Sequence, residues 1–267
     1  MAAVLLALLQ ANAVVMDEDA NLAAIDAAAG AAAAAGAAIL LTPELFPTGY
    51  APRRVRAELD PAGLPELRAK LAGIARRHRI GLVYSLPRIT PEGEWHISAT
   101  LLDAGGTSVL TYDKVHLFGR EERAAFSPAA RPPAVVDFNG IPTSMVICYD
   151  VEFPEAVRAA AVAGAELLLV PTALAHGFDD VPQVLLRARA LESQVTIAYA
   201  NHSGVEEGCR FLGGSVIAGP DGKLLAAAGE ELQLLYAEVD EGSAARARDE
   251  VPYLAERRPE IYRSWDS

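Results

Sequence analysis

The sequence predicts an α/β protein with mixed sheets, from two features of its pattern and one of its composition. Short apolar runs rich in Val, Ile and Leu alternate with longer segments rich in Ala, Leu and Arg, which is typical of strands buried between helices. Residues 103–106 and 219–222 have the composition of hairpin turns between apolar runs, so some neighbouring strands should be antiparallel. With 52% hydrophobic and 22% charged residues the chain can fill a sizeable core, which excludes a disordered protein.

The individual elements follow from these patterns in chain order. The apolar run 2–9 lacks a basic leading region and is far shorter than the roughly 20 residues of a membrane span, so it predicts a first buried strand. The stretch 23–38 is almost all Ala and Gly, and with Asn21 and Asp26 it predicts a tightly packed helix rather than a span. Pro154 stands at the favoured first-turn position of a helix. The expected strands are residues 4–9, 38–41, 81–86, 96–102, 109–112, 143–147, 167–170, 196–200, 214–218 and 233–239, and the expected helices are 21–35, 64–77, 154–163 and 181–193.

Residues 1–267 are expected to form a single domain with a C-terminal tail from about residue 243. No linker rich in Pro, Gly or Ser and no internal repeat divides the chain. The tail is charged and carries Tyr253, Tyr262 and Trp265. Such an aromatic tail either packs against a neighbour or remains free, and the sequence leaves both alternatives open.

Charge and cysteine content restrict the partners and the compartment. The formal net charge is −12, and the largest basic groupings, around residues 53–56 and 76–79, are typical of solvated helix faces, so no nucleic-acid partner is expected. Cys148 and Cys209 are too few for a disulfide framework, and their spacing does not match a zinc site. We therefore expect a cytoplasmic protein with no membrane partner.

Cys148 is the first candidate for chemistry. An apolar run ends at this residue and Pro154 opens a helix shortly afterwards. Ligands of open α/β sheets bind at the carboxyl ends of strands, where helix N–H groups can lower a thiol pKa. The alternative is structural, because free cysteines are often buried as small hydrophobic residues.

Glu44 and Lys114 also follow apolar runs. Burial at such a strand end would raise the pKa of Glu44 toward neutrality and suit it to general-base catalysis. Alternatively, Glu44 caps a helix or pairs with Arg53. Lys114 could stabilise an oxyanion, or it could be a surface charge paired with Asp113.

Together these segments resemble the nitrilase superfamily of carbon–nitrogen hydrolases. The family pattern is an acidic residue in a Pro-Glu loop ending near Gly-Tyr, a lysine in Lys-Val-His-Leu-Phe and a cysteine in Cys-Tyr-Asp-x-x-Phe-Pro-Glu. All three occur here in that order, at residues 43–50, 114–118 and 148–155. The resemblance continues through residues 171–173, 187–192, Asn201 and 213–222, and so covers nearly the whole chain.

The resemblance implies an α-β-β-α sandwich whose protomers pair into a longer stack, so we expect a homodimer or a higher homo-oligomer. It also implies a second glutamate that supports the lysine, six residues before the Pro of a Ser-Pro-Gly-like turn. Counting back from Pro128 gives Glu122, with Glu121 as the competitor because Ala129 replaces the usual Gly of that turn.

The resemblance implies cysteine-dependent hydrolysis of a non-peptide C–N bond, with Cys148 as nucleophile and Glu44 as proton carrier. Lys114 would stabilise the oxyanion together with the backbone N–H of Tyr149, and Glu122 would orient Lys114. No metal or organic cofactor is needed. A histidine could serve as the base instead of Glu44, but the contexts of the five histidines favour satisfied polar or surface roles.

The substrate is expected to be a small aliphatic or amino acid amide. Glu152 follows the nucleophile by four residues, where many relatives carry arginine, so it should favour cationic or neutral amides unless it merely pairs with Arg158. The alternatives are an N-carbamoyl amine hydrolase and a nitrilase, although true nitrilases tend to show Trp-Glu after the cysteine. A binding protein that lost the reaction is a further alternative. The expected substrate-binding residues are Tyr50, Tyr149, Glu152, Ala173 and His176.

Overall fold

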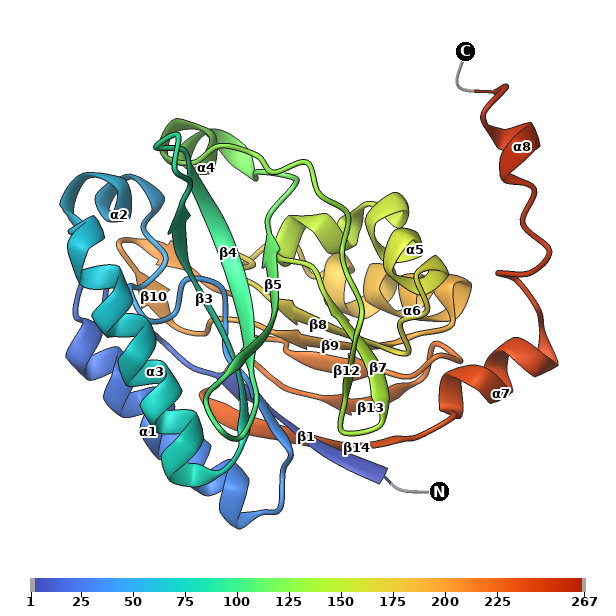
Figure 1. The fold of residues 1–267 in the computed structure, drawn as a ribbon, viewed down its shortest axis with the longest axis horizontal. Coiled ribbons are helices and arrows are strands. Elements are labelled where there is room, and N and C mark those ends of the chain that lie inside the picture. Colours follow the sequence, from blue (N-terminus) through green and yellow to red (C-terminus); the bar gives the residue numbers. More distant parts are fainter. Residues whose placement is uncertain (1–2, 266–267) are drawn as a thin grey trace.

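Two six-stranded sheets form the centre of the protein in a computed structural model that describes residues 3–265 (Figure 1). The strand order is β14-β1-β2-β3-β4-β5 in the first sheet and β13-β12-β9-β8-β7-β6 in the second, while β10 and β11 form a small hairpin. The first sheet contains β1 (Ala3–Gln10), β2 (Ile39–Leu41), β3 (Gly81–Ile89), β4 (Trp95–Leu102), β5 (Ser108–Asp113) and β14 (Gln233–Asp240). The second contains β6 (Val136–Phe138), β7 (Ile141–Met145), β8 (Leu167–Pro171), β9 (Thr196–Ala200), β12 (Val216–Ala218) and β13 (Leu224–Ala227), and the hairpin is β10 (Val205–Glu206) with β11 (Cys209–Arg210).

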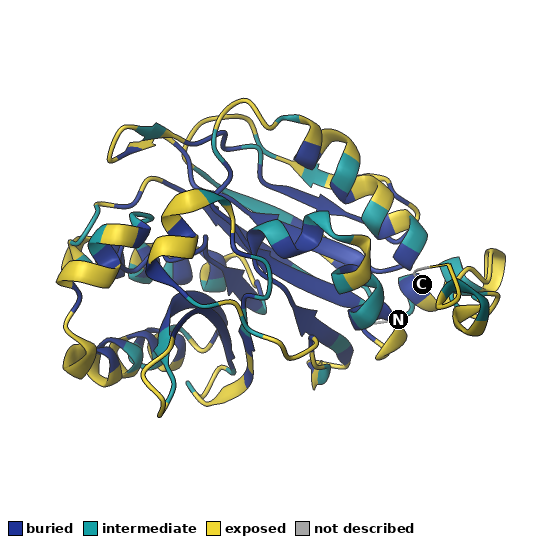
Figure 2. Ribbon diagram, turned by 90° about the horizontal axis from the view of Figure 1, so that it is seen from above, coloured by how far each residue is buried: buried dark blue, intermediate teal, exposed yellow. Residues whose placement is uncertain are grey.

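Helices cover the outer face of each sheet, which confirms the α-β-β-α sandwich. Helices α1 (Glu18–Ala34) and α3 (Leu64–His78) pack on the first sheet, and α5 (Pro154–Val162) and α6 (Leu186–Ser193) pack on the second. The alternation along β1 shows how the layers are held together. Leu6 and Leu8 belong to the core between the sheets, whereas Ala7 and Leu9 belong to the core under α1 and α3. Figure 2 shows the resulting buried interior, with exposed residues on the outer helices and loops.

Strand direction brings several strand ends to one place. In the first sheet β2 and β3 are parallel, and two antiparallel steps through β4 leave β5 running in the same direction as β2. In the second sheet β7, β8 and β9 are parallel. A hydrogen bond of 3.2 Å from the Glu44 N–H to the Thr172 carbonyl joins the loop after β2 to the end of β8. The carboxyl ends of both sheets therefore face a common region.

Most expected elements differ from the observed ones by one to three residues at an end, and three of these differences have a clear structural reason. The strand expected at 143–147 ends at Met145, because the chain leaves the sheet before Cys148. The strand expected at 214–218 begins at Val216, since Gly213 and Gly214 both have positive φ values that a strand does not adopt. The helix expected at 181–193 begins with a π-helical turn over Val181–Leu185.

Several short elements were not expected from the sequence. They are too short for a hydrophobic period to identify them. They comprise the four strands β6, β10, β11 and β13 and the helices α2 (Pro52–Glu58), α4 (Gly119–Ala125), α7 (Ser243–Glu250) and α8 (Pro259–Tyr262), together with 3-10 turns at Pro61–Gly63 and Cys148–Glu152.

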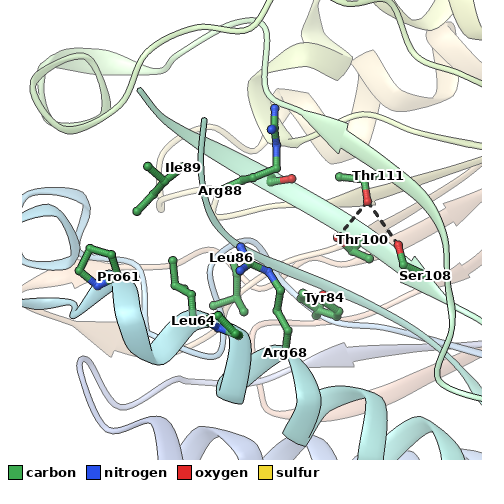
Figure 3. Close-up of a pocket in the computed structure, with 12 residues that line it drawn as sticks. Pro61, Leu64, Arg68, Tyr84, Leu86, Arg88, Ile89, Thr100, Ser108 and Thr111 are labelled. Carbon is green, nitrogen blue, oxygen red and sulfur yellow. Dashed lines mark hydrogen bonds between the residues drawn. The ribbon is translucent and has the colours of Figure 1, made fainter. Parts of the chain in front are cut away.

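The outer face of β4 and β5 lies beyond α3 and is polar. A surface hollow of about 450 Å³ lies there between α3 and β3–β5 (Figure 3). The hydroxyl of Thr111 lies 3.3 Å from that of Thr100 and 3.5 Å from that of Ser108. A solvated antiparallel sheet face accounts for this composition.

The C-terminal segment is attached at α7 and then leaves the sheets. The Gln194 side chain donates hydrogen bonds to the carbonyls of Ala247 at 2.7 Å and Val251 at 2.6 Å. Beyond these contacts the chain extends away from the sandwich to α8, where Trp265 is 70% exposed (Figure 1). In residues 3–265 no helix is long and apolar enough to cross a membrane.

Candidate active site

Four side chains meet where the carboxyl ends of the two sheets face each other. Glu44 follows β2, Lys114 follows β5, Glu122 lies on α4 and Cys148 lies in the turn after β7. The three charged residues have no exposed surface, and Cys148 is 6% exposed. We call these four residues the buried cluster. The cluster brings together Glu44, Lys114 and Cys148, the three residues for which the sequence predicted catalytic roles.

Lys114 connects both carboxylates of the buried cluster. Its Nζ donates to Glu44 Oε1 and to Glu122 Oε1, each at 2.7 Å. The two carboxylates overcome the effect of burial and hold the pKa of Lys114 well above its usual value, so the amine is charged. Asp113 forms its ion pair with Arg88 instead, so the alternative of a surface Lys114–Asp113 pair is wrong.

The geometry distinguishes the two candidate glutamates. Glu122 Oε1 also accepts a hydrogen bond of 2.5 Å from the Tyr50 hydroxyl, and Oε2 accepts one of 2.7 Å from the Phe118 N–H. Glu121 is exposed and pairs with Arg53 at 2.6 Å. Glu122 is therefore the glutamate in contact with Lys114, and Arg53 is not a partner of Glu44.

Glu44 combines burial with one unsatisfied oxygen. Desolvation and the neighbouring Glu122 raise its pKa to about 7, against the opposing effects of Lys114 and of the nearby Cys148 thiol. Within residues 3–265, Glu44 Oε2 has no hydrogen-bond partner. A buried carboxylate that titrates near neutrality and has a free acceptor oxygen is suited to receiving a proton.

Cys148 lies on a strained turn between β7 and α5. Its φ of 47° is in the left-handed region, which non-glycine residues seldom adopt. Desolvation and the Glu44 carboxylate raise the pKa of its thiol, so the resting sulfur is protonated, while the backbone N–H of Ala173 acts in the opposite direction. The thiol therefore needs a base when it reacts.

Asp150 holds this turn in place, a role that was not predicted from the sequence. It is fully buried, and its Oδ1 accepts hydrogen bonds from the backbone N–H of His116 at 2.8 Å and from the His116 ring at 2.7 Å. Its Oδ2 accepts from the Tyr112 hydroxyl at 3.0 Å and from the Ile147 N–H at 3.3 Å. The only signal in the sequence was its position two residues after the cysteine.

The expected substrate-binding residues lie at different distances from the cluster. Tyr50 contacts Glu122, and the Ala173 backbone faces the Cys148 sulfur. The Tyr149 ring packs edge-on against Phe118 and Phe153, with centroid separations of 5.2 and 4.9 Å. His176 is exposed, and its backbone N–H donates to the Arg210 carbonyl at 2.8 Å. Within residues 3–265 no hydrogen bond or ion pair joins its side chain to the buried cluster.

Glu152 interacts electrostatically with the buried cluster. Burial raises the pKa of its carboxyl, and the charges of Lys114 and Arg189 act in the opposite direction. The expected alternative partner, Arg158, donates instead to the backbone carbonyl of Glu192. Across residues 3–265 no salt bridge to the Glu152 carboxylate is present.

His202 and Glu206 form a second buried pair behind Glu44. The side chains of both have no exposed surface, and His202 Nδ1 lies 2.7 Å from Glu206 Oε1. His202 Nε2 lies 2.6 Å from the backbone carbonyl oxygen of Glu44. The sequence predicted a satisfied polar or surface role for His202, and the structure shows a buried side chain with a partner at each ring nitrogen. Glu206 was not predicted as its partner.

The chain is similar in sequence and in structure to amidases and other hydrolases. The sequence profile of the carbon–nitrogen hydrolase family matches residues 5–249. An amidase of Nesterenkonia sp. is 46% identical over 98% of this chain and 96% of its own, with a TM-score of 0.91. Structures of that amidase include complexes with acrylamide and butyramide, and one with the acetamide moiety of fluoroacetamide attached to the active-site cysteine.

Curated relatives agree with this result. A hydrolase of Pseudomonas protegens is 38% identical over 84% of this chain and 79% of its own length. An (R)-stereoselective amidase of a Pseudomonas species is 30% identical over 82% of this chain and 79% of its own. From the profile match, these identities and the shared fold we conclude that the chain belongs to the carbon–nitrogen hydrolase family.

Proposed function

We propose that this carbon–nitrogen hydrolase converts small amides to carboxylic acids and ammonia through a thioester on Cys148. The observation that carries the proposal is the buried cluster, in which one lysine amine bridges two carboxylates beside a protonated thiol. The Nesterenkonia amidase, which binds small amides and is modified at its cysteine, supports the same chemistry for this chain.

Acylation begins when the Cys148 sulfur attacks the amide carbon and Glu44 takes the thiol proton. The carbonyl oxygen becomes an oxyanion. An ammonium group has three N–H donors, and Lys114 uses two of them on Glu44 and Glu122, so the third can reach the oxyanion. Tyr149, at the start of a 3-10 turn, has a backbone N–H without an intrahelical acceptor, which supplies a second donor.

The same carboxyl completes the cycle. Protonated Glu44 gives its proton to the nitrogen as the C–N bond breaks, so ammonia leaves and a thioester remains on Cys148. Glu44 then takes a proton from water as the water oxygen attacks the thioester carbon. Loss of the sulfur from that carbon releases the acid and restores the thiol, which takes the proton back from Glu44.

The substrate class follows from the charge near the cluster. Within residues 3–265 the Glu152 carboxylate has no salt-bridge partner, and Lys114 is near enough to act on its pKa, so Glu152 disfavours a carboxylate-bearing substrate and favours cationic or neutral amides. The aromatic rings of Phe118, Tyr149 and Phe178 pack edge-on near the turn and provide apolar surface for an aliphatic group. Aliphatic and amino acid amides fit both features.

The test is an ammonia-release assay with aliphatic amides, amino acid amides, N-carbamoyl amines and nitriles. Hydrolysis of the amides should be fastest and should be abolished by Cys148→Ala, with the circular dichroism spectrum retained. Cys209→Ala is the matched control and should remain active, because Cys209 lies on β11 and is not one of the four residues of the buried cluster. Faster turnover of nitriles or carbamoyl amines would reassign the substrate class, and activity surviving in Cys148→Ala would refute the mechanism.

We also propose that the protein is a cytoplasmic homodimer. Both cysteines are free thiols, which supports a reducing compartment. Apolar side chains on the outer helices of the second sheet support self-association.

A further inference from the structure

His202 is buried among aromatic rings and bonds at both of its nitrogens. Its ring centroid lies 4.9 Å from that of Phe211 and 5.5 Å from that of Phe46. Nδ1 faces the Glu206 carboxylate at 2.7 Å, and Nε2 faces the Glu44 carbonyl oxygen at 2.6 Å. A carbonyl oxygen only accepts and an ionised carboxylate only accepts, so both nitrogens must donate and the ring is an imidazolium.

Glu206 is arranged to remain ionised. Its Oε1 also accepts the Ala13 N–H at 2.8 Å, and its Oε2 accepts the Tyr50 N–H at 2.9 Å. These donors and His202 lower the pKa of Glu206 despite its burial, and Glu206 in turn raises the pKa of His202. The pair is therefore a buried ion pair whose remaining hydrogen-bonding capacity is satisfied by the backbone.

The pair contacts both ends of the segment that carries Glu44. His202 donates to the carbonyl of the peptide between Glu44 and Leu45, and Leu45 has a strained φ of 52°. Glu206 holds the N–H of Tyr50, whose hydroxyl contacts Glu122. A residue with positive φ and a Cβ persists only when its surroundings hold it there.

Resting on the function proposed above, we propose that the His202–Glu206 ion pair is a positioning element that aims the Glu44 carboxylate at Cys148. The imidazolium fixes the strained Glu44–Leu45 peptide, and Glu206 fixes the main chain of Tyr50 at the other end of the segment. Neither side chain touches the reacting atoms. The charged groups around Glu44 are then Lys114, Glu122, the His202 imidazolium and the Glu206 carboxylate behind it.

Two variants and one control test this role. His202→Gln keeps an N–H that can reach the Glu44 carbonyl but removes the positive charge, and Glu206→Gln removes the negative charge. His78→Gln is the matched control, because His78 forms a histidine–carboxylate pair with Asp26 at 2.8 Å between α1 and α3. The measurements are kcat and KM for a neutral amide across pH, and the alkylation rate of Cys148 by iodoacetamide.

Both variants should lose about 10- to 100-fold in kcat with little change in KM, because a misplaced base impairs chemistry more than binding. The acidic limb of the pH profile should move to higher pH in His202→Gln, since an uncompensated Glu206 carboxylate then opposes ionisation of Glu44. In Glu206→Gln the acidic limb should stay at its wild-type pH. Without its carboxylate partner the imidazole becomes neutral, so the net charge of the pair remains zero. His78→Gln should match the wild type.

Iodoacetamide alkylation separates this proposal from the proposed function. If the wild type hydrolyses no amide, the proposed function fails, but slower alkylation of Cys148 in both variants would still support the positioning role. Unchanged kcat, unchanged alkylation and an unmoved acidic limb would overturn it. Losses of kcat and of alkylation rate that only accompany a lower melting temperature would also overturn the positioning role.

The protonation of His202 can be checked in the wild-type protein, even if a variant fails to fold. ¹⁵N-labelled histidine spectra at neutral pH should show two protonated ring nitrogens for His202. The signal can be assigned by its loss in His202→Gln, or by elimination with variants of the other four histidines. A single protonated nitrogen would show that the pair is neutral and would overturn the proposal.

Discussion

At the scale of single residues, the Lys114 amine has three protons, and the structure shows carboxylate acceptors for two of them. The two carboxylates hold the lysine charged although its side chain has no exposed surface. A charge with one free donor in such a low-dielectric place stabilises a developing oxyanion strongly, because little reorganisation is needed when the negative charge appears.

Lys114→Ala should therefore reduce the acylation rate more than 100-fold, which corresponds to about 3 kcal/mol or more of lost oxyanion stabilisation. Glu122→Gln should cost less, because an amide oxygen can still accept from Lys114. Pre-steady-state measurement of the ammonia burst reports the acylation rate directly. A nearly unchanged burst in Lys114→Ala would exclude the oxyanion role.

The pKa of Glu44, raised to about 7, predicts the acidic limb of the pH profile. Only the carboxylate can take the thiol proton, and lowering the pH below 7 converts it to the carboxylic acid. For a neutral amide, kcat/KM should fall roughly tenfold per pH unit below this pKa.

Steady-state rates between pH 5 and 9 measure this limb. Glu152→Gln is the matched control, since Glu152 is the other carboxyl near the cluster whose pKa is raised. The limb should persist in that variant. A profile flat down to pH 5, or a limb that disappears with Glu152, would show that Glu44 is not the titrating base.

Glu152 should control selectivity by charge. Replacing it with Gln should lower kcat/KM for an amine-bearing amide by about tenfold and leave a neutral amide of similar size almost unaffected, because only the cation loses a Coulomb attraction. The difference should shrink as salt is added. Equal losses for both substrates would indicate a structural role, and a wild-type preference for carboxylate-bearing amides would refute the charge argument.

At the scale of elements, the cluster depends on loops with unusual backbone conformations. Leu45 and Cys148 have φ values of 52° and 47°, and Gly49 has a φ of 75°. A Cβ on Gly49 would lie 2.7 Å from the Cα of Val15, which belongs to the loop after β1. The segment between β2 and α2 is therefore pressed against a neighbouring loop, and this contact helps to place Tyr50 against Glu122.

Gly49→Ala should reduce stability by about 2–4 kcal/mol, because the strain of a positive φ adds to a clash with backbone atoms. Gly36→Ala is the matched control. Gly36 follows α1 with a φ of 84°, and nothing lies within 4 Å of the position of its Cβ, so only the strain of about 1 kcal/mol applies. Urea unfolding of both variants measures the difference, and equal losses would refute the close contact.

At the scale of the whole molecule, the helices that cover the second sheet leave apolar side chains exposed on their outer side. Val162 of α5, Leu191 of α6 and Val184 of the preceding π-helical turn are 58%, 45% and 61% exposed. These segments cover the second sheet. A second copy packed against this layer would bury side chains that are otherwise in water, which agrees with the stacking implied by the family resemblance.

Light scattering should therefore give a mass of at least twice 28.2 kDa at micromolar concentration. Val184→Asp should shift the protein toward the monomer, since it would place a charge in the proposed interface. Val14→Asp is the matched control, because Val14 is 50% exposed in the loop after β1, away from the outer layer of the second sheet. A monomeric wild type, or equal effects of both variants, would contradict this interface.

The sequence by itself determined the layered α/β class, the ten principal strands and the identity of the chemical groups. Buried strands can be identified in the sequence as apolar runs. In this chain Glu44, Lys114 and Cys148 each follow such a run, and the residues that flank them are specific enough to indicate the family. Local sequence contains this information because periodicity, turn composition and motifs all act over a few residues.

Only the tertiary structure decided which groups touch. Glu121 and Glu122 are adjacent in sequence, and only the direction of each side chain from α4 places Glu122 on Lys114 and leaves Glu121 with Arg53. His202 reaches the Glu44 carbonyl across 158 residues of chain. Hydrogen bonds, burial and the resulting pKa shifts depend on how separate strand ends meet in space, and a one-dimensional pattern contains no such distances.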